Sequence, residues 1–158
     1  MKYLLLAVLI GVFFSTSSSC ATKEKSETTT VEGASADSAQ VIYLTKDTFK
    51  ALVFDFEASK EWKYVGKVPA ILDFYADWCG PCRNLAPLLE DIQKQYGKKL
   101  QVYKVNTDKE KELSATFGIR SLPTIVFIPV EGQPQAVMGY QPKEALEQII
   151  TQVLKVQK

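Results

Sequence analysis

From residue 41 onward, the apolar positions switch between the spacing of β-strands and the spacing of α-helices. The nearly continuous apolar run 70–76 (AILDFYA) is typical of a strand covered on both faces, and a single carboxylate, Asp73, interrupts it. Residues 131–134 (EGQP) predict the turn of a β-hairpin. The remaining β-favouring runs lie at 41–44, 100–105, 124–130 and 135–138.

Two helices are predicted in the first half of this region. Thr45 suits the N-cap of the first, whose apolar positions at helical spacing are Phe49, Leu52, Val53 and Phe56. The second covers 80–96, contains Pro87, and is followed by Gly97, which suits a helix end.

Two more helices are predicted further along the chain. A short one at 109–117 follows Thr107 or Asp108, either of which suits its N-cap. The last carries a buried stripe of Leu146, Ile149, Ile150, Val153 and Leu154. Strands that alternate with helices and end in a hairpin and a helix predict an α/β fold, with helices on both faces of the sheet.

The N-terminus has a different pattern. Behind the single charge of Lys2, residues 3–14 are almost wholly apolar. A helix needs about 20 residues to cross a bilayer, so this run is too short to span one and fits the hydrophobic region of a signal peptide at 1–19. We therefore expect export.

Cys20 follows the small, polar stretch 15–19, and this arrangement resembles a bacterial lipoprotein signal. The resemblance implies cleavage before Cys20 and a lipid anchor on it, in the periplasm. Ser17 departs from the Leu usual at that position, so ordinary cleavage after Ala21, giving an unanchored periplasmic protein, stays open.

Residues 20–40 contain one large apolar residue, Val31. Such a stretch cannot bury enough surface to offset its ordering entropy, so we expect a flexible tether with a reach of about 25 Å. Residues 41–158 then form one domain, which is what a chain of 158 residues accommodates.

Charge and composition exclude several functions. The chain has 19 Lys and Arg against 18 Asp and Glu, so it lacks the basic excess that nucleic-acid binding requires. It has no His, which excludes Ser-His and Cys-His nucleophile pairs and imidazole metal ligands within this chain.

Two of the 3 Cys lie in the sequence Trp78-Cys79-Gly80-Pro81-Cys82, directly after a predicted strand and at the start of a helix. At this position the first Cys can face solvent. Free backbone N–H groups and the helix dipole favour an anion there, so we expect a lowered pKa for Cys79. Two Cys at this spacing can form a disulfide. A zinc site, a structural disulfide and a non-catalytic binding or holdase module are the alternatives.

The motif resembles thioredoxin, and the similarity extends from about Val41 to Val156. It implies the thioredoxin fold, with a central mixed β-sheet. Asp73 matches the family's buried Asp and Lys104 the Lys near it, while Pro123 matches the cis-proline that faces the active-site Cys. Gly139 matches the Gly that lets substrate backbone approach.

The resemblance also implies a mechanism without a cofactor or metal. Cys79 attacks a substrate disulfide, and Cys82 then attacks Cys79 with help from Asp73 and Lys104. A buried carboxylate has a raised pKa, which suits Asp73 to accept a proton. The residues implied to contact substrate are Trp78, Gly80, Pro81, Leu122, Pro123 and Gly139.

Gly-Pro between the two Cys resembles the reducing members of the family, which implies a protein-disulfide reductase acting on disulfide-bearing exported proteins. We expect the protein to be a monomer. An exported reductase needs electrons, so a membrane thiol transporter is an expected partner. An exported oxidase or isomerase is the alternative. Segment 57–69 is longer than in a minimal thioredoxin; we favour a structural role over a partner surface near Trp62 and Tyr64.

Overall fold

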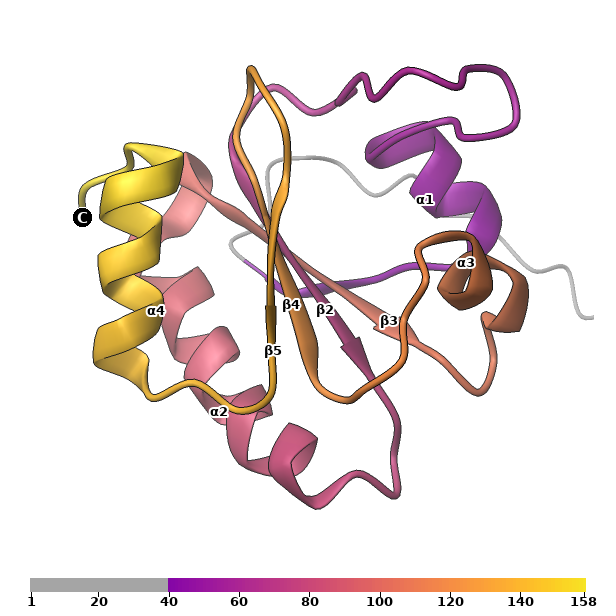
Figure 1. Cartoon of the computed structure of the whole chain (residues 1–158). Coiled ribbons are helices and arrows are strands. Elements are labelled where there is room, and N and C mark those ends of the chain that lie inside the picture. The colour runs from indigo at the N-terminus through magenta and orange to yellow at the C-terminus, as the bar shows by residue number, and fades with distance from the viewer. Residues whose placement is uncertain (1–39) are drawn as a thin grey trace, which may run out of the picture. The chain divides into compact units, whose positions relative to one another are not determined.

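A computed structural model describes residues 40–158 of the chain (Figure 1). The predicted signal peptide, Cys20 and the predicted tether up to residue 39 lie outside the described residues. Among residues 40–158, no helix is long and apolar enough to cross a membrane.

Five strands form one sheet in the order β1-β3-β2-β4-β5. The strands are β1 (Ile42–Tyr43), β2 (Ala70–Tyr75), β3 (Gln101–Asn106), β4 (Thr124–Ile128) and β5 (Gln135–Met138). β3 runs parallel to both β1 and β2, whereas β4 is antiparallel to β2 and β5 antiparallel to β4. The sheet is therefore mixed, as the resemblance implied, and β4 and β5 form the predicted hairpin.

Helices cover both faces of this sheet, with α2 and α4 on one side and α1 and α3 on the other (Figure 1). The helices are α1 (Lys46–Leu52), α2 (Gly80–Tyr96), α3 (Lys111–Thr116) and α4 (Lys143–Ile149), with the short turns η1 (Gly97–Lys99) and η2 (Ile150–Leu154). This arrangement confirms the predicted fold class.

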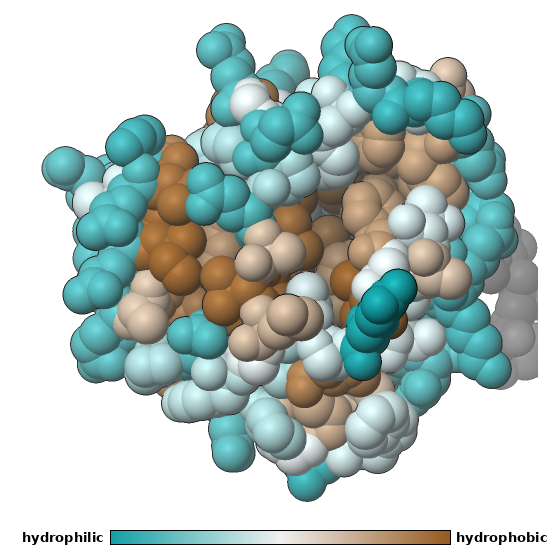
Figure 2. All heavy atoms as spheres, viewed as in Figure 1, coloured by the Kyte–Doolittle hydropathy of each residue, from teal (hydrophilic) through white to brown (hydrophobic). Residues whose placement is uncertain are grey.

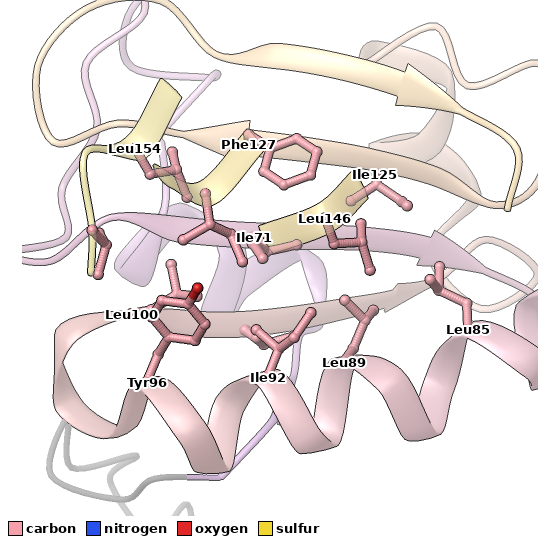
Figure 3. Close-up of a cluster of buried hydrophobic side chains, with 13 residues drawn as sticks. Ile71, Leu85, Leu89, Ile92, Tyr96, Leu100, Ile125, Phe127, Leu146 and Leu154 are labelled. Atoms are coloured by element: carbon pink, nitrogen blue, oxygen red, sulfur yellow. The ribbon is translucent and has the colours of Figure 1, made fainter. Parts of the chain in front are cut away.

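Each face of the sheet has its own buried apolar cluster. Beneath α2 and α4, side chains of the two helices pack on those of β2, β3 and β4; Figure 3 labels Ile71, Leu85, Leu89, Ile92, Tyr96, Leu100, Ile125, Phe127, Leu146 and Leu154. On the opposite face, the fully buried aromatic residues are Phe49 and Phe74.

Helix boundaries agree with the sequence pattern at α2, which ends at Gly97 with a φ of 53°, a conformation that suits Gly. Thr45 is the N-cap of α1, and its side chain accepts a hydrogen bond from the backbone N–H of Thr48. α1 nevertheless ends at Leu52, so the prediction that Phe56 lies on this helix is wrong.

The N-cap predicted for α3 is also wrong. Glu110 precedes the helix, and neither Thr107 nor Asp108 caps it. The Thr107 hydroxyl instead donates to the carbonyl of Tyr75 at 3.2 Å, and Asp108 accepts a bond from Trp78. Thr107 and Asp108 therefore bond to the end of β2 and to the loop that follows it, and neither caps α3.

Segment 57–69 contains no helix and folds back on the α1 side of the sheet. The Val65 N–H donates to the carbonyl of Val53 at 2.9 Å, and the rings of Phe54 and Trp62 lie 4.9 Å apart. The Tyr64 hydroxyl donates to the carbonyl of Val68 at 2.9 Å. These contacts support the structural role of the segment.

The pattern did not predict a buried polar contact between α2 and β3. Gln93 is 1% exposed, and its side-chain oxygen accepts a 2.6 Å hydrogen bond from the Val102 N–H. Its side-chain nitrogen donates to the carbonyls of Leu100 at 2.8 Å and Gly97 at 3.0 Å. One side chain therefore satisfies the backbone where the chain passes from α2 into β3.

Replacing Gln93 by Leu should destabilise the protein by about 1–3 kcal/mol, because it leaves the buried Val102 N–H and the Leu100 carbonyl without a partner. Urea denaturation at neutral pH measures the change. Gln95→Leu, at an exposed position of the same helix, is the control and should change stability by less than about 0.5 kcal/mol. Equal stability of the Gln93→Leu and Gln95→Leu proteins would show that the buried amide is dispensable.

Candidate active site

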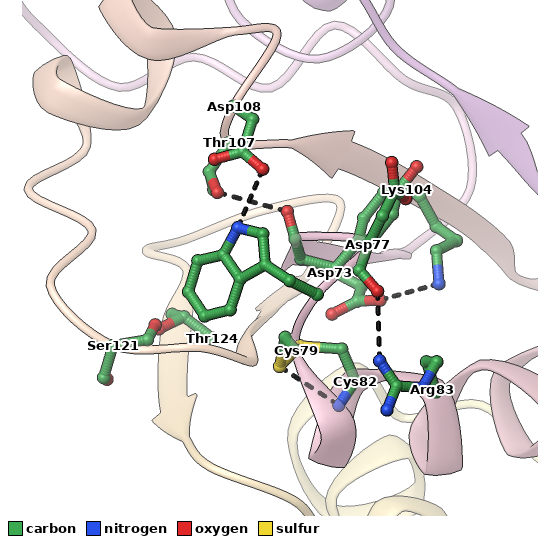
Figure 4. Close-up of a disulfide and its surroundings, with 12 residues drawn as sticks. Asp73, Asp77, Cys79, Cys82, Arg83, Lys104, Thr107, Asp108, Ser121 and Thr124 are labelled. Atoms are coloured by element: carbon green, nitrogen blue, oxygen red, sulfur yellow. Dashed lines mark hydrogen bonds and ion pairs between the residues drawn. A yellow bond between two sulfur atoms is a disulfide. The ribbon is translucent and has the colours of Figure 1, made fainter.

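Cys79 and Cys82 form a disulfide at the start of α2, with their Cα atoms 5.3 Å apart (Figure 4). Cys79 is the N-cap of this 17-residue helix, and the Cys82 N–H donates to its sulfur at 3.2 Å. Gly80 and Pro81 complete the first turn, where Pro costs no hydrogen bond. When the disulfide is reduced, this N–H and the helix dipole favour a thiolate on Cys79.

In this disulfide state, the Cys79 sulfur has little contact with solvent. Cys79 is 4% exposed and Cys82 is 2% exposed. Both pack in a small apolar cluster with Ala76, against which Tyr75 and Leu122 also pack. Leu122 and Tyr75 therefore help to cover the disulfide.

Asp73 lies in β2 opposite Lys104 of β3, and the Lys104 Nζ is 3.0 Å from the Asp73 Oδ2. The two residues are 0% and 3% exposed. The Asp73 Oδ1 has no hydrogen-bond partner among the described residues. Burial raises the pKa of this carboxyl group, and the attraction of Lys104 lowers it by less, so the net direction is upward.

A cavity of about 240 Å³ reaches the site from the side of the sheet edge. Cys82, Lys104 and Tyr75 are among the residues that line it. The Lys104 Nζ lies 4.5 Å from the centre of the Tyr75 ring, a cation–π distance that helps hold the buried ammonium group. The cavity gives water a route to the side of Cys82 that faces Lys104.

The peptide bond between Leu122 and Pro123 is cis, as the resemblance implied. Gly139 lies beside it, because its N–H donates to the Pro123 carbonyl at 2.7 Å. Gly139 has a φ of 85°, which favours glycine, and a Cβ at this position would meet no atom within 4 Å. Residues far apart in the sequence thus meet at one end of the sheet.

Trp78 is 69% exposed, and its indole N–H donates to the Asp108 Oδ2 at 2.9 Å (Figure 4). Asp108 is itself held, since its backbone N–H donates to the Asn106 Oδ1 at 3.0 Å. Sequence reasoning missed this role of Asp108, although the residue stood out as an N-cap candidate. It also missed Tyr75, whose packing against Lys104 no local pattern indicates.

The structure thus brings together all the site residues expected within the domain: the disulfide, the Asp73–Lys104 pair, Trp78, and the loops of Pro123 and Gly139. Cys20 lies outside the described residues. Within residues 40–158, no group of three His, Cys, Asp or Glu side chains could hold a metal ion. The geometry fits a cysteine pair that cycles between dithiol and disulfide, with a buried carboxyl group nearby.

Comparison with known proteins agrees with this chemistry. The thioredoxin family model matches residues 40–152. Thioredoxin of Borreliella burgdorferi is 49% identical over 109 residues, which cover 69% of this chain and 93% of that protein. Thioredoxin 1 of a Nostoc species is 38% identical over 107 residues, covering 68% of this chain and 91% of that protein.

Solved structures give the same result. Chloroplastic thioredoxin z superposes with a TM-score of 0.63 at 26% identity, over 74% of this chain and 96% of that one. A mutant thioredoxin from Halobacterium salinarum superposes with a TM-score of 0.59 at 27% identity, over 76% of this chain and 96% of the other.

Replacing Asp73 by Asn should change how stability depends on pH. The pKa of the Asp73 carboxyl group is raised in the folded state above its ordinary value of 3.8, so the folded protein holds this proton more tightly than the unfolded chain. The wild type therefore loses free energy of unfolding, relative to Asp73→Asn, as the pH rises from 3.8 through the raised pKa. Below 3.8 the difference is constant.

Urea denaturation of the disulfide forms across a pH series measures this difference. Asp47→Asn is the control, because it removes a carboxylate that is 88% exposed. It shows how much the loss of a surface charge alone changes the free energy of unfolding. A difference between wild type and Asp73→Asn that stays flat or grows with rising pH would contradict a raised pKa for Asp73.

Proposed function

The chain belongs to the thioredoxin family of thiol–disulfide oxidoreductases, and we propose that it reduces disulfides in exported proteins through the dithiol of Cys79 and Cys82. Protein-disulfide reductase activity follows from the family and its Cys pair. The observation that carries the roles of the two Cys is the N-cap position of Cys79, with the Cys82 N–H at 3.2 Å from its sulfur.

In the first step, the Cys79 thiolate attacks one sulfur of the substrate disulfide. A bond forms between the Cys79 sulfur and that substrate sulfur, and the other substrate sulfur leaves as a thiolate. In the second step, the Cys82 sulfur attacks Cys79, and the remaining substrate sulfur leaves. Two electrons have passed to the substrate, and the chain holds the Cys79–Cys82 disulfide.

Cys82 must lose its proton before the second step, and Asp73 is the proposed acceptor. A carboxyl group whose pKa lies above its ordinary value exchanges a proton with a thiol more readily than an exposed one. Lys104 at 3.0 Å stabilises the carboxylate before it takes the proton. The cavity that Cys82 and Lys104 line supplies a path for water-mediated transfer.

The substrate surface consists of the groups that surround the disulfide. Leu122 packs against the two Cys, and Gly139 leaves room for a polypeptide beside Pro123. The exposed Trp78, held by Asp108, forms an apolar wall. Gly80 and Pro81 keep the start of α2 free of large side chains.

Export rests on the sequence of residues 1–20, in which a short apolar run leads to Cys20. Lipidation of Cys20 would attach the domain to a membrane through the tether of residues 20–40. The domain would then receive electrons from a membrane thiol transporter and work on exported proteins as a monomer. Ordinary cleavage after Ala21 gives the same activity without the anchor.

A Cys82→Ser variant should stop after the first step, because a serine hydroxyl at that position cannot resolve the bond between Cys79 and the substrate. We expect covalent complexes with exported proteins, seen on non-reducing gels and released by dithiothreitol. Cys79→Ser is the control and should form none. Complexes that depend on Cys82 rather than Cys79 would reverse the proposed order of attack.

A Cys20→Ala variant tests the anchor. If Cys20 is lipidated, the mature wild type carries a lipid on an N-terminal Cys20 and sediments with membranes, whereas Cys20→Ala appears in the fraction of exported proteins without an anchor. Mass spectrometry of the mature N-terminus checks the cleavage site. A wild-type chain that begins at Thr22 would show ordinary cleavage instead.

A further inference from the structure

An apolar groove of about 320 Å³ lies on the face of β4 and β5 that is turned toward α3. Its floor consists of two pairs of neighbouring residues, Thr124 with Met138 and Val126 with Ala136. The segment 117–120, between α3 and β4, forms a side wall. Figure 2 shows apolar side chains gathered around a hollow on this side of the molecule.

The groove exists because α1 and α3 pack mainly over β1, β2 and β3. β5 is the last strand of the sheet, and its side chains remain largely uncovered, with Met138 at 70% exposure. Val126 is only partly buried. The groove therefore leaves apolar side chains of β4 and β5 open to contact with a partner.

The groove is continuous with the place where the disulfide is attacked. Leu122 packs against Cys79, Thr124 opens the groove two residues later, and Met138 directly precedes Gly139. An extended polypeptide advances about 3.3 Å per residue, so the four residues from Leu122 to Val126 span about 13 Å. A substrate segment that leaves the attacked cysteine along β4 therefore reaches the floor at Val126 roughly four residues away.

The charge of the residues that line the groove indicates which substrate segments it can bind. Of the described residues that line it, only Arg120 is charged. Arg120 is exposed. A guanidinium group beside apolar surface binds a carboxylate in two hydrogen bonds, more specifically than an ammonium group does.

We propose that this groove is a second substrate site, which selects disulfides flanked by an extended segment with an apolar residue about four positions from the cysteine and an acidic residue beside it. The inference rests on the proposed function, because it assumes that substrates are polypeptides attacked by Cys79. It adds a sequence preference that the disulfide chemistry alone does not supply.

The test compares peptides that carry one cysteine in a mixed disulfide with glutathione. The parent peptide has Leu at the fourth and Glu at the third position from the cysteine. Three further peptides replace Leu by Ser, Glu by Lys, or both. Each peptide is made in two forms, with these residues either before or after the cysteine. The assay uses the wild-type chain with dithiothreitol as the reductant. A small aromatic disulfide is the reference substrate. The readout is the ratio of kcat/KM for peptide to kcat/KM for the reference.

We expect the Leu-Glu peptide to exceed the Ser-Lys peptide by about tenfold or more in one flank direction. Ala136→Glu should remove the preference for Leu, and Arg120→Glu should reverse the preference between Glu and Lys. The matched controls are Gln135→Glu, at the neighbouring position of β5, and Lys111→Glu on α3, and both should leave the ratios unchanged.

Equal ratios for all peptides with the wild type, or equal effects of the control and groove variants, would overturn the groove proposal while leaving the reductase intact. A wild-type chain that reduces the reference disulfide but no peptide or exported protein would instead overturn the proposed function.

Discussion

A carboxyl group and an ammonium group face each other at 3.0 Å inside the sheet, where neither Asp73 nor Lys104 reaches solvent. Burying either charge alone would be costly, so each residue depends on the other for its place in the fold. The pairing of β2 with β3 sets them opposite one another. The net result is a buried carboxyl group whose pKa is raised, in the same site as the disulfide.

The start of α2 is the second constraint, and it acts directly on the two cysteines. β2 ends at Tyr75, and within a few residues the chain turns into a helix whose N-cap is Cys79, with the Cys82 N–H donating to the Cys79 sulfur. The helix is anchored by its packing on the sheet and by the Gln93 amide at its far end. The cysteines are therefore held on a rigid element, with the buried pair below them.

Leu122 covers the disulfide, and it therefore connects the cysteine chemistry with the recognition of substrate. On the proposed substrate path, a polypeptide that reaches Cys79 lies along the loop of Pro123 and continues over the partly buried Val126 of β4 and the exposed side chains of β5. Because β5 is the last strand of the sheet and Ala136 and Met138 are exposed on its groove face, the fold leaves this surface available. The cysteine pair thus lies at the start of α2, whereas the proposed selection among substrates takes place at the edge of the sheet.

Local patterns in the sequence determined the strands, the long helix with its end at Gly97, the cysteine motif and the apolar setting of Asp73, because periodicity and capping depend on residues close together in the chain. The lengths of α1 and α3 and the buried side chain of Gln93 escaped prediction. So did the bond from Trp78 to Asp108, which joins residues 30 positions apart. Such contacts exist only after strands pair and helices pack, since burial and hydrogen-bond partners are then shared among distant segments. The chemistry was therefore readable from the sequence, whereas the cover over Cys79 and the groove along β4 and β5 were decided by the tertiary structure.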